Sequence, residues 1–391
     1  MRKLLVIVMI LLQAFALPAA EFAYHVFELR TEAEFSDGVF PVSVVYQFDF
    51  PVKDLIEGST TVVAAKLDAG LDPRTLRQDP DDGSFYALDP DSVDFDLDYL
   101  AMYGEINLYI DQGFMHKERS DKDLFRLFAS LDVRFEHAYD KLEWMSDSDH
   151  LDALFNYVVD GVKYYRFSGS SWTGAPELKG KRQNNTVSLS FAFTVDYLRE
   201  TVTERDGVMF KSWLRWAPDF IPLSTGYSDF LASYNTLTVS KTLLSKANRT
   251  WSEGLTWVSL VLDEEITYRY IWGDKVPAYI QGGELWEDAI VPNLRHVFTS
   301  MTTLTLYGPQ LGVPDLYPDI SLFIGLGWGL GKALNSKSNE RYAEFVSCYG
   351  LRGELVLFNI CEFFVEVGCV LDPAFNEEHY VKGRAGFQFG I

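Results

Sequence analysis

Segments in which apolar and polar residues alternate recur along almost the whole chain. In residues 187–197 every odd position is apolar, and every even position is small or polar. Residues 42–50, 131–136 and 344–357 show the same alternation, and helical spacing fits none of them. Because neighbouring side chains of a β-strand point to opposite faces, each segment predicts a strand with one apolar face and one wettable face.

The length of these segments separates a soluble sheet from a membrane barrel. Soluble strands usually have about five or six residues, whereas a tilted membrane strand needs about nine to eleven. Most segments here have ten residues or more. The sequence therefore predicts an all-β fold, a closed antiparallel transmembrane β-barrel of about 14 strands (12–16). The predicted strands are residues 23–34, 39–50, 59–70, 100–113, 125–140, 187–199, 207–216, 230–245, 255–271, 294–307, 319–332, 341–357, 361–371 and 380–391.

The connections between these strands alternate in length. If the first strand starts in the periplasm, the three longest connections all fall at the outer end, as residues 71–99, 141–186 and 272–293. Long extracellular loops and short periplasmic turns are typical of membrane barrels. Residues 157–165 contain an Asp-Gly hairpin signal. They predict a raised outer hairpin, an inward-folded constriction, or an extra strand pair that would make sixteen.

The first twenty residues have the pattern of a signal peptide. Arg2 and Lys3 precede an apolar run and then small residues, so we expect cleavage after Ala16 or Ala20. The pattern predicts export by the Sec pathway, and we expect residues 21–391 to form a single barrel domain. Removing the signal leaves 32 basic and 56 acidic residues, a net charge of 32 − 56 = −24. This charge argues against nucleic acid as a partner.

The last predicted strand alternates up to the final residue, and Phe387, Phe389 and Ile391 lie on one face. In this the chain resembles the bacterial outer-membrane β-barrel class, whose members commonly end in such a strand, with Phe or Trp usual at the last position. The resemblance implies that these three residues form an assembly signal read by the barrel assembly machinery. It also implies contact with outer-membrane lipid and a place in the outer membrane of a diderm bacterium.

On a barrel the polar face of each strand lines the lumen. The charged positions on those faces are Glu105, Asp111, Asp132, Arg134, Glu136, Asp196, Lys211, Arg215, Glu344, Arg352, Glu354, Glu362, Glu366 and Arg384. Interleaved signs allow either an ion-selective pore or a lumen closed by cross-strand ion pairs. A three-residue turn at residues 358–360 predicts that Arg352 pairs with Glu366 across the lumen wall, stabilising it by about 0.2–1 kcal/mol.

Four glycines, Gly325, Gly327, Gly329 and Gly331, alternate with larger residues on one predicted strand. No phosphate-binding motif contains them. We expect these glycines to face the lumen, at a place where something packs closely or where the wall bends.

Aspartates crowd the second outer loop without the frame of a calcium-binding loop. We expect a solvated, self-repelling loop and no metal or cofactor, with ion binding at Asp79, Asp81, Asp89 and Asp91 as the weaker alternative. His137 and Asp140 are the candidate catalytic pair. His137 has lipid-facing parity, and no hydrolase motif occurs, so we do not expect an enzyme.

Three functions are compatible with these observations. The first is a porin-like channel or transporter for a small solute. The second is a surface adhesin or interaction barrel with a closed lumen. The third is a soluble secreted β-protein.

Overall fold

The structure of the protein is a computed structural model. The structure describes residues 24–34, 42–52, 60–78, 95–116, 123–140, 156–159, 162–168, 171–173, 183–200, 204–221, 223–224, 229–245, 258–277, 280, 284–286, 289–290, 294–309, 311, 316–334, 341–357, 361–371 and 380–390.

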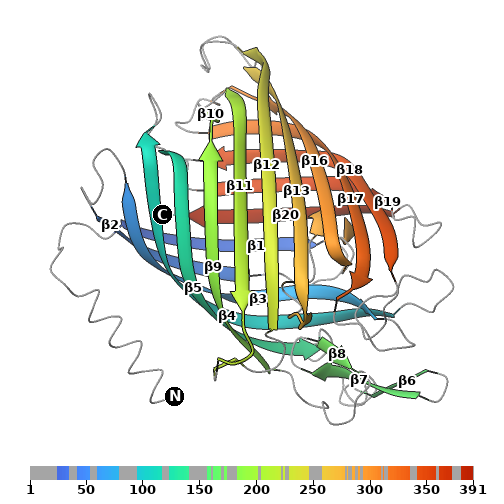
Figure 1. Cartoon of the computed structure of the whole chain (residues 1–391). Coiled ribbons are helices and arrows are strands. Elements are labelled where there is room, and N and C mark those ends of the chain that lie inside the picture. Colours follow the sequence, from blue (N-terminus) through green and yellow to red (C-terminus); the bar gives the residue numbers. More distant parts are fainter. Residues whose placement is uncertain are drawn as a thin grey trace.

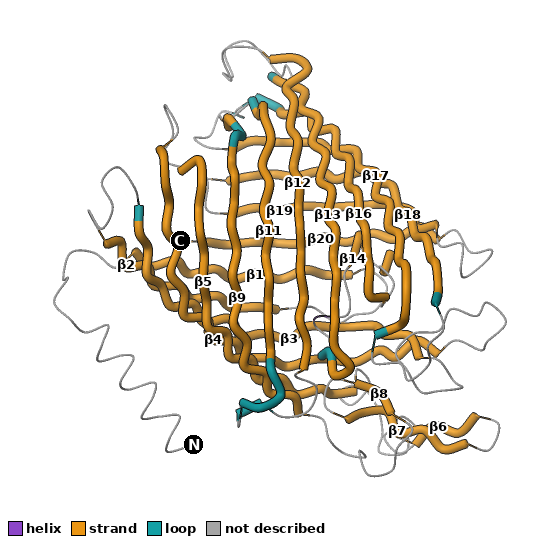
Figure 2. The backbone as a smooth tube through the Cα atoms, in the orientation of Figure 1, coloured by secondary structure: helices purple, strands orange, loops and turns teal. Residues whose placement is uncertain are grey.

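Among the described residues, fourteen long strands and the two-residue β10 make up the main sheet (Figures 1 and 2). The long strands are β1 (Tyr24–Glu34), β2 (Val42–Val52), β3 (Thr61–Gln78), β4 (Phe95–His116), β5 (Asp123–Asp140), β9 (Gln183–Asp196), β11 (Arg205–Ala217), β12 (Asp229–Ser245), β13 (Ser259–Lys275), β16 (Leu294–Tyr307), β17 (Leu316–Ala333), β18 (Tyr342–Leu357), β19 (Cys361–Leu371) and β20 (Tyr380–Gly390). The short elements are β6 (Asn156–Val159), β7 (Val162–Ser168), β8 (Ser171–Thr173), β10 (Arg199–Glu200), β14 (Glu284–Trp286) and β15 (Ala289–Ile290).

Each of the fourteen long strands pairs with two others, and every pairing is antiparallel. The first and last of the fourteen strands, β1 and β20, pair with each other, and β5 pairs with β9 across the longest connection. The strand β9 then pairs with β11, so the ring of pairings is complete. The strands therefore form a barrel without a free edge.

All fourteen predicted segments are strands in the structure, and the predicted three-residue turn is confirmed because Leu357 pairs with Cys361. The structure differs at the second outer loop, where β3 and β4 continue beyond the predicted ends and pair as far as Gln78 and Phe95. The hairpin predicted around residues 157–165 exists as β6 and β7. Together with β8 it makes a separate sheet, so the sixteen-stranded alternative is wrong.

No helix among the described residues is long and apolar enough to cross a membrane. The predicted signal peptide, residues 1–20, lies outside the described residues.

The two faces of the barrel have opposite chemistry. The outward face exposes large apolar side chains, among them Phe191, Ile324 and Leu351. The inward face buries charged and hydroxyl side chains, including Asp132 and Arg215. A soluble protein has the reverse distribution, so this surface fits a hydrocarbon environment.

Among the described side chains, a carboxylate on β13 interrupts the outward apolar face. Glu264 of β13 lies opposite Thr302 of β16 and accepts hydrogen bonds from the hydroxyls of Thr302 and Ser300, the latter at 2.5 Å. These hydroxyls satisfy polar atoms that lipid would leave unpaired.

Candidate functional site in the barrel lumen

The first group of inward charged residues lies on β4, β5 and β11. The Arg134 guanidinium binds Glu105 Oε2 at 2.9 Å and Glu136 Oε2 at 3.2 Å, and Arg215 Nη2 lies 3.4 Å from Glu105 Oε1. Asp132 joins this network because it lies 4.0 Å from Arg215 Nε. We call these five residues the first lumen network.

Neutral groups complete the first lumen network. The carboxylate of Asp132 accepts hydrogen bonds from Asn107, Ser130 and Ser190, at 2.5–2.8 Å. The guanidinium of Arg134 lies over the ring of Tyr103, 4.1 Å from its centroid. Since the side chains of Arg134 and Glu136 are only 8% and 1% exposed, this network is a rigid part of the wall.

The second lumen network surrounds Arg352 of β18. Arg352 lies opposite Glu366 in register, and its Nη1 binds Glu366 Oε1 at 3.0 Å, which confirms the predicted pair. The same guanidinium binds Glu354 at 2.9 Å and Glu362 at 2.6 Å. Arg384 is opposite Glu366 on β20, but its side chain lies outside the described set.

Carboxylates outnumber cations in the second lumen network. Asp319 of β17 lies opposite Glu354, so four acidic side chains surround Arg352. The register places Arg384 opposite Glu366 as a second cation, so four carboxylates face two arginines. The local potential is therefore negative, which attracts cations.

A cavity of about 330 Å³ adjoins the second lumen network. Its lining combines the charged groups Asp319, Arg352, Glu354 and Glu366 with hydroxyl groups of Thr303, Thr305, Tyr307 and Ser321, and with the apolar Leu285, Met301 and Phe323. Most of these side chains come from the inward faces of β16 to β19, whereas Leu285 belongs to the connection between β13 and β16. This mixture suits a small solute with both polar and apolar parts.

The described residues of the connection between β13 and β16, which are 276–277, 280, 284–286 and 289–290, contact the inward face of the wall. Leu285 of β14 packs against the inward side chains Phe323, Val346, Cys348 and Val370. An added Cβ at Gly325 would lie 2.8 Å from Leu285 Cγ and 2.7 Å from Cys348 Sγ. Only glycine leaves room for Leu285 there. We refer to these described residues of the connection as the inward loop.

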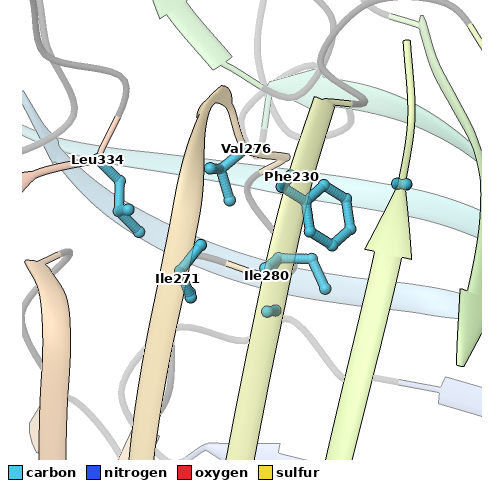
Figure 3. Close-up of a cluster of buried hydrophobic side chains, with 7 residues drawn as sticks. Phe230, Ile271, Val276, Ile280 and Leu334 are labelled. Carbon is cyan, nitrogen blue, oxygen red and sulfur yellow. The ribbon is translucent and has the colours of Figure 1, made fainter. Parts of the chain in front are cut away.

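A second contact holds the inward loop near the loop end of the barrel. Val276 and Ile280 pack with Phe230, Ile271 and Leu334 (Figure 3), together with the small inward residues Ala217 and Ala232. The Arg269 guanidinium also donates to the Ile280 carbonyl at 3.5 Å. The inward loop thus contacts two parts of the wall.

The glycine prediction is confirmed in both of its forms. Something packs closely at Gly325, as described above. At Gly331, φ is +106°, and the pairing of β16 with β17 shifts register between Leu294 and His296. The wall is therefore irregular at this end of β17.

Other predicted lumen residues lie outside the two networks. Asp111 pairs with Arg126, Asp196 accepts a hydrogen bond from its own turn at Leu198 N, and Lys211 is exposed on the inward face of β11. Glu344 is in β18, but its side chain is not among those described.

The predicted assembly signal is described only at Phe387, whose ring lies 4.8 Å from that of Phe363 on the outward face. The side chain of Phe389 and all of Ile391 lie outside the description, as do the side chains of His137 and Asp140. The aspartates Asp79, Asp81, Asp89 and Asp91 are also outside it.

Sequence reasoning missed Asp319, Tyr307 and the inward loop. Asp319 has the same parity as the four glycines of β17, so its inward position was available from the alternation. For the inward loop the signal was weaker, because its contacts depend on small residues in distant strands.

A prediction tests the position of the inward loop. In a Leu285→Cys variant we expect mild oxidation to link the new thiol to the native Cys348, which is buried beside Leu285. An unreduced denaturing gel would detect the link as a faster band. The same change in a Cys348→Ser background is the control. A band that forms equally in both backgrounds would contradict the placement.

Fourteen antiparallel strands in a ring, with an apolar outward face and a charged inward face, constitute the architecture of bacterial outer-membrane β-barrels. No protein-family model and no curated protein matches the sequence.

Solved structures with a similar fold include CdiB from Escherichia coli, at TM-score 0.49 and 10% identity over 96% of this chain and 64% of that one. CdiB from Acinetobacter baumannii gives 0.46 and 8% over 94% and 60%. The toluene transporter TodX of Pseudomonas putida gives 0.36 and 11% over 96% and 92%. The chain thus spans less than two thirds of either CdiB chain.

Proposed function

We propose that this protein is exported to the outer membrane and acts there as a channel for small solutes, with a lumen narrowed by the inward loop. The observation that carries the proposal is the cavity of about 330 Å³ on the inward face, between Leu285 and the second lumen network around Arg352. The outward apolar face supports the membrane placement.

The charges of the lumen support a preference for cations. Four carboxylates surround Arg352, and three carboxylates face two arginines in the first lumen network. Rings or clusters of carboxylates favour cations in other pores. We therefore propose that small cations and polar cationic solutes pass more readily than anions.

A surface barrel with a closed lumen is the second candidate. The nearly complete burial of Arg134 and Glu136 and the packing of the inward loop both favour it. In that case the loop end would carry the function through a binding partner.

The experiment begins with the full chain expressed with its signal sequence. Outer membranes are isolated, and the extracted protein is compared unheated and boiled on a denaturing gel. We expect a band whose mobility shifts on boiling. A soluble protein without a shift would contradict the membrane placement.

The purified protein is then reconstituted in planar bilayers under a potassium chloride gradient. We expect discrete conductance steps and a reversal potential on the cation-selective side. A heat-shifted protein without conductance would favour the closed-lumen candidate. A reversal potential of the opposite sign would contradict the proposed cation preference but not the channel.

A further inference from the structure

Glu264 places a carboxylate in the middle of the outward face. On β13 the outward positions on either side of it are Leu262 and Ile266, whereas the inward positions Val261 and Arg269 are almost completely buried. The register with both neighbouring strands is continuous from Val261 to Arg269, so the alternation of faces is unbroken there. A carboxylate that faces hydrocarbon is costly, and acidic residues in membrane segments almost always face protein or water.

The neighbouring strand β16 satisfies this carboxylate in part. Ser300 Oγ donates a hydrogen bond to Glu264 Oε1 at 2.5 Å, and Thr302 Oγ1 donates to Glu264 Oε2. An ionised carboxylate can accept about four hydrogen bonds, so these two hydroxyls leave Glu264 with capacity for further donors. In hydrocarbon that capacity would stay unfilled.

A second polar group lies on the same face. Asn235 of β12 is opposite Tyr268 of β13, two outward positions from Glu264 along that strand. Asn235 Oδ1 accepts a hydrogen bond from Ser212 of β11 at 2.8 Å, and Asn235 Nδ2 donates to Ser233 Oγ at 3.2 Å. An amide nitrogen carries two N–H groups, so Asn235 can donate once more. We call the following residues the outward polar patch: Ser212, Ser233, Asn235, Glu264, Ser300 and Thr302.

The outward polar patch spans four adjacent strands. β11, β12, β13 and β16 pair in this order and lie side by side in the wall (Figure 1). Among the described side chains, the other carboxylates in the middle of strands occupy inward positions, as Asp132 and Glu366 do. On the next strand, β17, six successive outward positions are apolar: Ile320, Leu322, Ile324, Leu326, Trp328 and Leu330.

Contact with protein would remove this patch from lipid. Lipid chains are as apolar as leucine, so an apolar face gives little preference for protein over lipid, whereas hydrogen-bonding groups do. Two copies of this chain inserted in the same direction present the patch at the same depth. The patch contains an acceptor in Glu264 and a donor in Asn235, and a self-complementary contact about a twofold axis requires both.

We propose that the outward polar patch is the contact between two copies of this chain in a twofold dimer. The axis runs along the membrane normal close to Ile266, which lies opposite Ser300 on one side and Leu237 of β12 on the other. A ring of three or more copies would need a second, different contact surface. The inference rests on the membrane placement proposed above and is independent of conduction.

Cross-linking in isolated outer membranes tests the position of this contact. In an Ile266→Cys variant we expect a short bifunctional maleimide to link two chains, which a boiled denaturing gel shows as a band of doubled mass. Leu67→Cys is the matched control, because Leu67 is exposed on the outward face of β3, on the far side of the ring. The unmodified protein, which keeps its three native cysteines, gives the background. Equal dimer bands in the two variants, or none in Ile266→Cys, would overturn the proposal.

Native mass spectrometry of the full chain in detergent measures the strength of the contact. In a Glu264→Leu variant we expect the dissociation constant of the dimer to rise about thirtyfold, since the contact contains this carboxylate twice and each membrane hydrogen bond contributes roughly fivefold. Ser347→Ala is the control: Ser347 is an outward residue of β18 that donates to the Leu371 carbonyl, and its loss should leave the dissociation constant unchanged. A monomeric unmodified protein would overturn the proposal, and so would an unchanged constant in Glu264→Leu.

The mobility shift on boiling separates this proposal from the membrane placement. All variants should retain that shift and the conductance of each unmodified barrel. If the shift persists while the unmodified protein is monomeric, the dimer contact alone is wrong. If the shift is absent from the unmodified protein, the membrane placement itself fails.

Discussion

Replacing Arg134 with glutamine is expected to lower the free energy of unfolding of the barrel by about 3–5 kcal/mol. Arg134 is the cation that compensates both Glu105 and Glu136, and the Glu136 side chain is almost completely buried. Glutamine keeps a similar length and hydrogen-bonding capacity but leaves the two carboxylates without their shared positive charge. The midpoint and slope of urea unfolding in lipid vesicles, followed by tryptophan fluorescence, give this free energy.

Arg126→Gln is the control for Arg134→Gln. Arg126 also pairs with a carboxylate on the inward face, Asp111, but its side chain is 39% exposed. Because water screens this pair, we expect its loss to cost no more than about 1 kcal/mol. Equal losses of unfolding free energy in the two variants would contradict the expectation that burial makes the ion pairs of the first lumen network more stabilising.

Replacing Gly325 with leucine is expected to raise the conductance of the reconstituted barrel. The new Cβ would lie within 3 Å of both Cys348 Sγ and Leu285 Cγ, so one of the two must move. Cys348 is held by the long strand β18, whereas Leu285 belongs to the three-residue strand β14. The leucine should therefore displace the inward loop and widen the lumen, and single-channel recording in planar bilayers measures the change.

Two controls accompany Gly325→Leu. Gly353→Leu places the same side chain on the outward face of β18, where no heavy atom lies within 4 Å of the added Cβ, and should leave the conductance unchanged. Leu285→Ala in the Gly325→Leu background makes room for the new side chain and should lower the conductance again. A reduced conductance in the single variant would mean that the leucine fills the lumen while the inward loop stays in place.

The strands of the barrel wall and their register can be predicted from short stretches of the sequence. A period of two identifies each strand, and a short turn fixes the register of its neighbour, so the pair of Arg352 and Glu366 follows from residues 352–366 alone. The long outward apolar runs specify which face meets lipid.

The contacts inside the barrel could not be predicted from the sequence in the same way. The packing of Leu285 depends on the absence of a side chain at Gly325, and that of Ile280 depends on Ala217 and Ala232. These partners lie far from the inward loop in sequence, and no periodicity links a loop residue to a gap in a distant strand. In the first lumen network, Arg134 lies opposite Glu105 on the neighbouring strand, so that pair depends on local register, whereas the contact of Arg215 with Glu105 spans β5 and β9.

The pairing of β1 with β20 has a consequence for the number of strands that the wall can contain. Neighbours in this ring run in opposite directions all the way round, which is possible only for an even number of strands. Without β20, the next strand β19 would meet β1 in a parallel orientation, and the existing hydrogen-bonding pattern could not join them. Such a barrel can therefore be enlarged or reduced only by whole hairpins. Its strand number, and with it its circumference, changes by two strands at a time.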